Sequence, residues 1–285
     1  MPLKTHLHWV KSACKHYYKA KTKHDIHSPF LSQWVEEIYE DDRWFEAFGI
    51  IIGIRHFWKQ SPDKVKYIDD PGAGSRAGQG LERSVKEMVK YSAIDEYSGR
   101  LLFRIANFHQ PETILELGTN LGFSAMYFRA ARRYAKIISI EGQPEVAELA
   151  KKSFDIARLP IIDIRTGTFQ DQLPKAIADL NKIDLFWLDG DHRCGPTIDY
   201  INQVLPHLEE NSIVIVGDIH WSAGMEKAWE QLKKMPEVTL SLDLFHFGIL
   251  FFIKEEGHVE HFSIIPYWMK PWRLGFFSYV DRSGE

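Results

Sequence analysis

The chain has 285 residues, of which 45% are hydrophobic and 26% are charged, a composition typical of a globular protein with an ordinary core. The net charge of −4 argues against a nucleic-acid-binding protein, and no apolar run approaches the ~20 residues of a membrane-spanning helix. Cys14 and Cys194 lie far apart without metal-ligand spacing, so we expect neither a disulfide framework nor a zinc site. The N-terminus lacks the apolar core of a signal peptide, so a cytoplasmic location is expected.

Residues 1–24 contain six lysines and no acidic residue. This basic segment is either an arm for an anionic partner or a solvated amphipathic helix, and the second is the plainer interpretation. Contact with acidic lipid is less favoured. A homodimer is compatible with the sequence.

The first hundred residues are predicted to be largely helical. Residues 1–60 carry apolar and aromatic side chains at helical spacing, with a break at Ser28-Pro29. Residues 61–80 form a turn-rich insertion that includes a strand-like Val65–Ile68. A further helix is expected over 81–108, with a break near Ser98-Gly99.

From residue 113 onward, short apolar strands alternate with amphipathic helices, and the last two strands are expected to pair antiparallel. The predicted strands are Thr113–Leu117, Lys136–Ile140, Ile161–Arg165, Ile183–Leu188, Ser212–Val216, Val238–Leu244 and Phe247–Ile253. This alternation predicts a doubly wound α/β fold, in which helices cover both faces of a mainly parallel sheet.

A glycine turn follows the first of these strands, in the segment Glu116–Gly122. Glycines there let the backbone approach a ligand, and the next helix offers free N–H groups. The second strand ends in Glu141, which is placed to bind a ribose diol, so an adenosine-containing ligand is expected. A dinucleotide fingerprint would need glycines at Gly118, Asn120 and Phe123, and it fails after the first.

The Glu-x-Gly-x-x-x-Gly pattern resembles the first motif of class I S-adenosylmethionine-dependent methyltransferases. With the later segments Gly167–Asp171, Leu188–His192 and Val216–Asp218, residues 92–255 are similar to small-molecule O-methyltransferases of the catechol and caffeoyl-CoA kind. The resemblance implies a seven-stranded Rossmann-like sheet, S-adenosylmethionine as cofactor and a small-molecule acceptor. The cofactor-binding residues that it implies are Glu116, Gly118, Thr119, Asn120, Gly122, Ser124, Glu141, Gly142, Thr168, Phe169, Gln170 and Asp189.

The resemblance also bears on the reacting centre, where metal-dependent relatives hold Mg²⁺ with one aspartate after the fourth strand and an Asp-Asn pair after the fifth. Asp189 and Asp218 match the two aspartates, but Ile219 stands at the asparagine position. His192 stands where the relatives have a lysine that helps as a base. Two interpretations are open: Mg²⁺ or another divalent metal on Asp189 and Asp218, or a metal-free site with His192 or His220 as the base. Asp189 is itself a catalytic candidate.

Several of these residues have structural alternatives. Asp191 either binds metal or orients His192, Asp218 alternatively caps the next helix, and His220 alternatively packs beside Trp221. Cys194 is not expected to act as a nucleophile, because methyl transfer needs no covalent step.

A second glycine pattern, Gly72–Ala77, formally fits a dinucleotide fingerprint, but no strand–helix–strand unit follows it. It is a surface loop or an anion-binding backbone nest with Arg76.

The expected organisation is a helical N-terminal extension or substrate cap (1–91), a methyltransferase domain (92–257) and a C-terminal tail (258–285). The expected activity is methyl transfer to an oxygen, most simply a hydroxyl, of a small molecule. Methyl transfer to an amine and a binding module without turnover are the alternatives.

Overall fold

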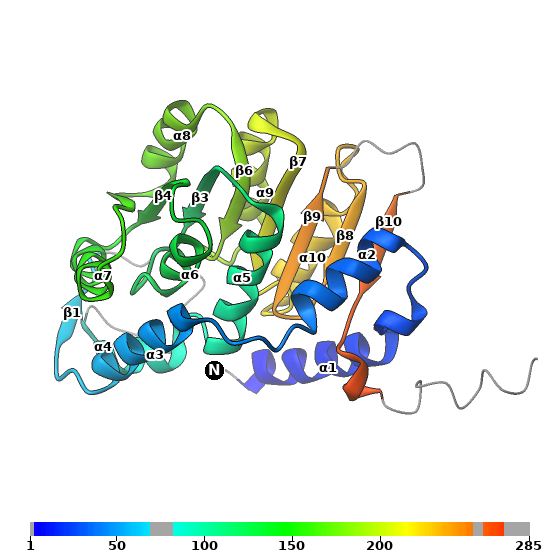
Figure 1. Cartoon of the computed structure of the whole chain (residues 1–285), viewed down its shortest axis with the longest axis horizontal. Helices are drawn as coiled ribbons and strands as arrows, with labels where there is room; N and C mark the ends of the chain where they lie inside the picture. The colour runs from blue at the N-terminus through cyan, green and yellow to red at the C-terminus, as the bar shows by residue number, and fades with distance from the viewer. Residues whose placement is uncertain (1–2, 69–81, 253–258, 271–285) are drawn as a thin grey trace, which may run out of the picture.

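The computed structural model describes residues 3–68, 82–252 and 259–270, so the predicted loop Gly72–Ala77 lies outside the described residues. Its centre is a sheet with the strand order β10-β8-β9-β7-β6-β3-β4-β5 (Figure 1). The strands are β3 (Thr113–Leu117), β4 (Lys136–Glu141), β5 (Asp163–Thr166), β6 (Ile183–Leu188), β7 (Leu208–Gly217), β8 (Leu240–Asp243), β9 (Phe247–Phe251) and β10 (Glu260–Ser263).

The predicted doubly wound α/β fold is confirmed. β3, β4, β5, β6 and β7 are parallel, and β8 pairs antiparallel with β9, as predicted. β9 also pairs antiparallel with β7, which the sequence did not predict. The sheet differs from the expected seven strands by β10, which lies parallel to β8 and comes from the predicted tail. This edge strand is short and half polar, so no sequence pattern distinguishes it from a loop.

Helices cover both faces of the sheet because its central strands are apolar on both sides. Ile114 and Ile137 belong to one core, under α5 (Glu96–His109), α6 (Phe123–Ala131) and α7 (Pro144–Ala157). Leu115 and Ile138 belong to the other, under α8 (Phe169–Leu180), α9 (Cys194–Val204) and α10 (Ala223–Leu232). The alternation along each strand therefore divides the molecule into two apolar layers.

The N-terminal region continues the first of these cores. Its largest fully buried side chains, Trp34, Phe48 and Trp58, belong to the same cluster as Ile114. Its elements are α1 (Leu3–Lys19), α2 (Pro29–Trp34), a π-helical turn (Val35–Tyr39), α3 (Glu46–Lys59), the hairpin β1 (Lys64–Lys66) and β2 (Glu82–Ser84), and α4 (Val85–Tyr91). Figure 1 shows α1, α3 and α4 at one end of the sheet strands.

Three short 3₁₀ turns complete the described elements, at Lys23–Asp25, Leu205–His207 and Tyr267–Met269. Within the described ranges, no helix has the length and apolar character needed to cross a membrane.

The helix expected over 81–108 is in fact two helices, α4 and α5. The break falls before Asp95, whose side chain caps α5 by accepting hydrogen bonds from the backbone N–H groups of Tyr97 and Ser98. Gly99 lies inside α5, where a Cβ would stand 2.1 Å from the Tyr127 ring. Gly99 therefore marks close helix packing and not the expected break.

Candidate active site

A cavity of about 470 Å³ lies at the carboxyl ends of β3, β4, β6 and β7. This is the edge at which open α/β sheets bind their ligands, and the volume suits a ligand the size of a nucleoside derivative. The predicted site residues that line it are Gly118, Thr119, Asn120, Ser124, Glu141, Phe169, Asp189, Asp191, His192 and Asp218.

The glycine turn closes onto Glu141. The backbone of Gly118 has φ +103°, and a Cβ there would lie 2.5 Å from the backbone oxygen of Asp189, so only glycine fits. Asn120, at φ 50°, donates its backbone N–H to Oε2 of Glu141 at 2.8 Å. The other carboxylate oxygen accepts the N–H of Gln143 at 2.9 Å. The structure therefore brings together the turn and the acidic residue that the sequence paired.

Glu116 lies beneath the cavity and does not line it. Its side chain is fully buried and accepts hydrogen bonds from the hydroxyls of Ser124 and Ser139. Burial raises the pKa of Glu116 to about 7, although the two serine hydroxyls act in the opposite direction. Glu116 therefore holds Ser124 from below.

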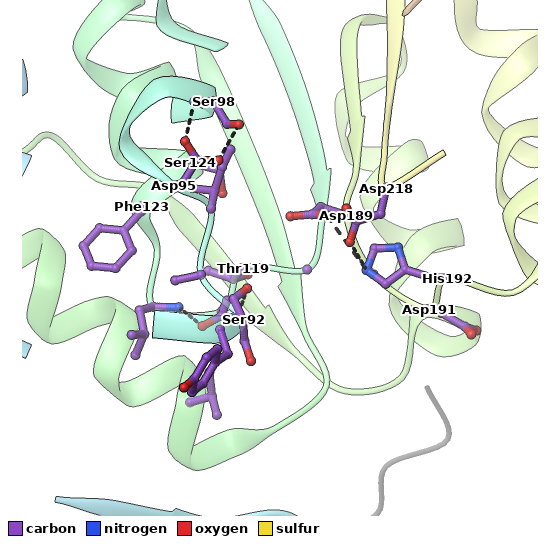
Figure 2. Close-up of a pocket in the computed structure, with 18 of the residues that line it drawn as sticks. Ser92, Asp95, Ser98, Thr119, Phe123, Ser124, Asp189, Asp191, His192 and Asp218 are labelled. Carbon is purple, nitrogen blue, oxygen red and sulfur yellow. Dashed lines mark hydrogen bonds and ion pairs between the residues drawn. The ribbon is translucent and has the colours of Figure 1, made fainter. Parts of the chain in front are cut away.

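Asp189, His192 and Asp218 converge at the other end of the cavity (Figure 2). Nε2 of His192 is 3.9 Å from Oδ1 of Asp189 and 3.8 Å from Oδ2 of Asp218. Burial, and then the charges of Asp218 and Glu116, raise the pKa of Asp189 well above its ordinary value. Asp218 sits at φ 53°, an uncommon conformation for a residue with a side chain.

His220 does not reach this cavity. Its Nδ1 lies 2.9 Å from Oε1 of Glu226, and its Nε2 lies 3.0 Å from Oδ2 of Asp243, so both ring nitrogens have carboxylate partners. With His16 it lines a separate cavity of about 180 Å³. The adjacent Ile219 is fully buried among the apolar side chains of the second core.

Asp191 lines the cavity, but its carboxylate is bound elsewhere. It forms an ion pair with Arg193 and accepts the hydroxyl of Tyr200 at 3.2 Å. Figure 2 shows its side chain turned away from His192.

The segment after β5 contributes one side chain to the cavity, the ring of Phe169. Thr168 instead caps α8 by accepting the N–H of Asp171, and Gln170 donates to the hydroxyl of Tyr200 at 3.3 Å. Gly122 and Gly142, also predicted to hold the cofactor, do not line the cavity. Gly122 is the N-cap residue of α6, at φ +81°, where a Cβ would meet the Phe154 ring at 2.5 Å.

Sequence reasoning missed the wall formed by residues 90–98. Ser92 accepts a hydrogen bond from the side chain of Asn120 at 3.1 Å, and Asp95 accepts the hydroxyl of Ser98 at 2.6 Å. The local signal for this helix start was Asp95, an N-cap residue type, with the acidic Glu96 in the first turn, and the prediction of a helix over 81–108 did not use it. Nothing local signalled that this start faces the cavity.

It also missed an aromatic wall beyond Asp218. Trp9 of α1, Trp221, His246 and Phe247 line the cavity there. Trp9 comes from the first helix, so its place depends on packing across the whole chain.

Comparison with known proteins shows what this domain resembles. Residues 115–219 match the family described as a methyltransferase domain. The structure of a methyltransferase from Podospora anserina bound to S-adenosylhomocysteine superposes with a TM-score of 0.56, at 13% identity over 80% of this chain and 97% of that one. An O-methyltransferase from Bacillus cereus, also in complex with S-adenosylhomocysteine, gives 0.53 at 14% identity over 79% and 97%. The domain therefore has the class I methyltransferase fold.

Similar curated sequences indicate which kind of methyltransferase the domain resembles. A catechol O-methyltransferase of Niastella koreensis is 31% identical over 129 residues, which are 44% of this chain and 57% of that protein. A catechol O-methyltransferase of Mycobacterium tuberculosis is 24% identical over 135 residues, 47% of this chain and 60% of that protein. The chain thus spans somewhat more than half the length of these relatives. The resemblance to S-adenosylmethionine-dependent O-methyltransferases of the catechol kind is confirmed for this domain.

Proposed function

We propose that the chain transfers the methyl group of S-adenosylmethionine to an oxygen, most simply a hydroxyl, of a small molecule. One observation carries the proposal: Glu141, on which the turn closes, and the Asp189–His192–Asp218 cluster line one cavity from either side of β3. One side suits the adenosine of the cofactor, and the other presents groups that bind or deprotonate a hydroxyl.

In this proposal the cofactor lies along the carboxyl ends of β3 and β4. Glu141 accepts the ribose hydroxyls, and the ring of Phe169 packs against the adenine. The backbone at Gly118 approaches the methionine part closely, because it has no side chain. The N-terminus of α6 offers free N–H groups, which favour binding of the methionine carboxylate of the cofactor. Glu116 acts indirectly, through Ser124.

We propose further that Asp189 and Asp218 hold a divalent metal ion. Carboxylate oxygens are ligands for such ions, and a Cβ at Gly217 would lie 2.5 Å from Oδ1 of Asp189, so the glycine leaves room for this carboxylate. When bound, the ion supplies a positive charge that lowers the pKa of an acceptor hydroxyl. His220 has no catalytic part in this proposal, because both its nitrogens face carboxylates outside the cavity.

Residues 1–91 are proposed to act as a cap on the acceptor end, because Trp9 of α1 lines the cavity. The acceptor then meets an aromatic wall that includes Trp221 and Phe247, which suits a flat apolar body. A cytoplasmic location and a homodimer stay predictions from the sequence.

The experiment is to incubate the purified full chain with methyl-labelled S-adenosylmethionine and a panel of small hydroxyl and amine compounds. We expect label on oxygen, and a lower rate for Asp189→Asn and Glu141→Ala. Glu148→Ala, at an exposed position on α7, is the matched control and should keep the rate. If only amines were labelled, the acceptor would be an amine and not a hydroxyl. Cofactor binding without any labelled product would favour a binding module without turnover.

A further inference from the structure

The cluster at the acceptor end offers ligands of two chemical kinds. The ligand atoms of Asp189, His192 and Asp218 all lie within 4.8 Å of one another, two being carboxylate oxygens and one an imidazole nitrogen. The separations of 3.9 and 3.8 Å from His192 exceed hydrogen-bond length. The three groups thus face a common point, and Figure 2 draws the two long ion pairs from His192 to the aspartates as dashed lines.

The neighbouring side chains of Ile219 and Asp191 add no further ligand to these three groups. Ile219, next to Asp218, is fully buried in the second core and offers no ligand atom. The carboxylate of Asp191 is held by Arg193 and Tyr200. Among the described residues, the cluster identified as able to hold a metal consists of these three side chains.

We infer that His192 is the third protein ligand of this site and that the site selects a borderline transition ion, of the Fe²⁺, Co²⁺ or Zn²⁺ kind, over Mg²⁺. Mg²⁺ prefers oxygen ligands and dehydrates reluctantly, whereas imidazole nitrogen suits the later first-row ions. With an ion bound, the Nε2 lone pair of His192 is used in ligation. His192 is then a ligand and not the general base that the sequence alone allowed.

The inference rests on the proposed function only in placing the ion beside the acceptor. Metal binding is therefore measured on the full chain without S-adenosylmethionine, by calorimetric titration with CoCl₂ and with MgCl₂. Since oxygen ligands alone also favour Co²⁺ to some degree, the decisive quantity is how the ratio of the two affinities changes when the nitrogen is removed.

His192→Asp replaces the nitrogen by oxygen and keeps three ligands. We expect it to reduce the preference for Co²⁺ over Mg²⁺ by about tenfold or more. His192→Asn, which leaves the two carboxylates, should weaken Co²⁺ more than Mg²⁺ and serves as the second variant if the third carboxylate disturbs folding. His246→Asn is the matched control, because His246 lines the same cavity outside the cluster, and its ratio should equal that of the wild type.

Proton NMR of the Co²⁺-loaded protein gives an independent readout. A ligating imidazole has a strongly shifted, exchangeable N–H resonance. We expect one in the wild type and in His246→Asn, and its loss in His192→Asp.

An unchanged affinity ratio in His192→Asp, or a wild-type spectrum without the shifted resonance, would overturn the inference. So would failure of the wild type to bind Co²⁺. A protein that shows the nitrogen ligand but never binds S-adenosylmethionine would leave the metal site standing and remove the proposed function.

Discussion

Gly217 and Asp189 meet across two neighbouring strands: a Cβ on Gly217 would lie 2.5 Å from Oδ1 of Asp189. Gly217 ends β7, and Asp189 directly follows β6, its parallel neighbour. The space that a side chain would fill is therefore the space in which this carboxylate stands beside Asp218.

The first prediction is that Gly217→Ala displaces the Asp189 carboxylate. Real Cβ atoms do not approach so closely, so the carboxylate or the strand end has to move. We expect metal affinity, measured by calorimetry, and the rate of methyl transfer each to fall about tenfold or more, since small misplacements cost heavily in catalysis. Gly195→Ala is the control, because a Cβ there meets nothing within 4 Å. Equal losses in both variants would count against the displacement.

The second prediction concerns Glu116 and pH. Burial raises its pKa from 4.5 to about 7, so the native state retains a proton that the unfolded chain has already lost in this interval. The free energy of unfolding therefore loses this contribution as the pH rises from about 4.5 to about 7, in total about 3 kcal/mol. Urea unfolding of the wild type and of Glu116→Gln, measured across this pH interval, gives the difference between their free energies of unfolding at each pH.

Glu116→Gln stays neutral at every pH, so its stability relative to the wild type should improve as the pH rises to 7. Ser139→Ala is a companion variant, because it removes one hydroxyl that donates to Glu116. It should raise the pKa of Glu116 further. A difference between wild type and Glu116→Gln that is independent of pH would contradict the assignment.

The third prediction concerns His16, which joins α1 to the body of the protein through Asp243. Nε2 of His16 lies 3.2 Å from the Asp243 carboxylate. Burial on its own raises the pKa of that carboxyl, but the hydrogen bonds from His16 and His220 hold it well below the ordinary value. His16→Gln should lower the free energy of unfolding by about 1–3 kcal/mol in chemical denaturation. His6→Gln, on the exposed side of α1, should cost little.

In His16→Gln the affinity for S-adenosylhomocysteine should stay unchanged, because the network lies in a separate cavity. A large loss of cofactor affinity without a loss of stability would instead give these histidines a direct part in the site.

The fourth prediction is that Ile219→Asn does not create a metal ligand. The side chain points into the second core and is fully buried, so the amide would be buried without a designed partner. We expect a loss of about 1–3 kcal/mol or more in the free energy of unfolding and no gain in Mg²⁺ affinity. Ile219→Val, with an expected cost of about 1 kcal/mol, is the apolar control. A gain in Mg²⁺ affinity for Ile219→Asn would show that this position faces the metal.

The cofactor half of the cavity could be predicted from the sequence because its signals are local. Apolar strands alternate with helices, and the same short segment holds the glycine turn and the strand that ends in Glu141. The alternation of apolar strands with amphipathic helices therefore predicted the fold class, and the placement of the glycines predicted the position of the turn. Thr168 and Gln170 were harder, because a helix cap and a cofactor contact use the same residue types.

The acceptor half depends on distant segments that meet only in the folded chain. Trp9 reaches the cavity from α1. His192 follows β6 and His220 follows its neighbour β7, and the ends of these two strands look alike in sequence. His192 lines the cavity and His220 does not, because Asp243 at the end of β8 holds the His220 ring outside it. The pairing of β10 with β8 was equally hidden, because an edge strand needs no apolar pattern.

Cofactor binding is tested most directly by calorimetric titration of the wild type and Glu141→Ala with S-adenosylhomocysteine. We expect one binding site per chain in the wild type. We expect the affinity to be lower in Glu141→Ala by about tenfold or more, because the carboxylate proposed to accept the ribose hydroxyls is gone. No binding to the wild type, or equal affinity in the two proteins, would contradict the proposed cofactor site.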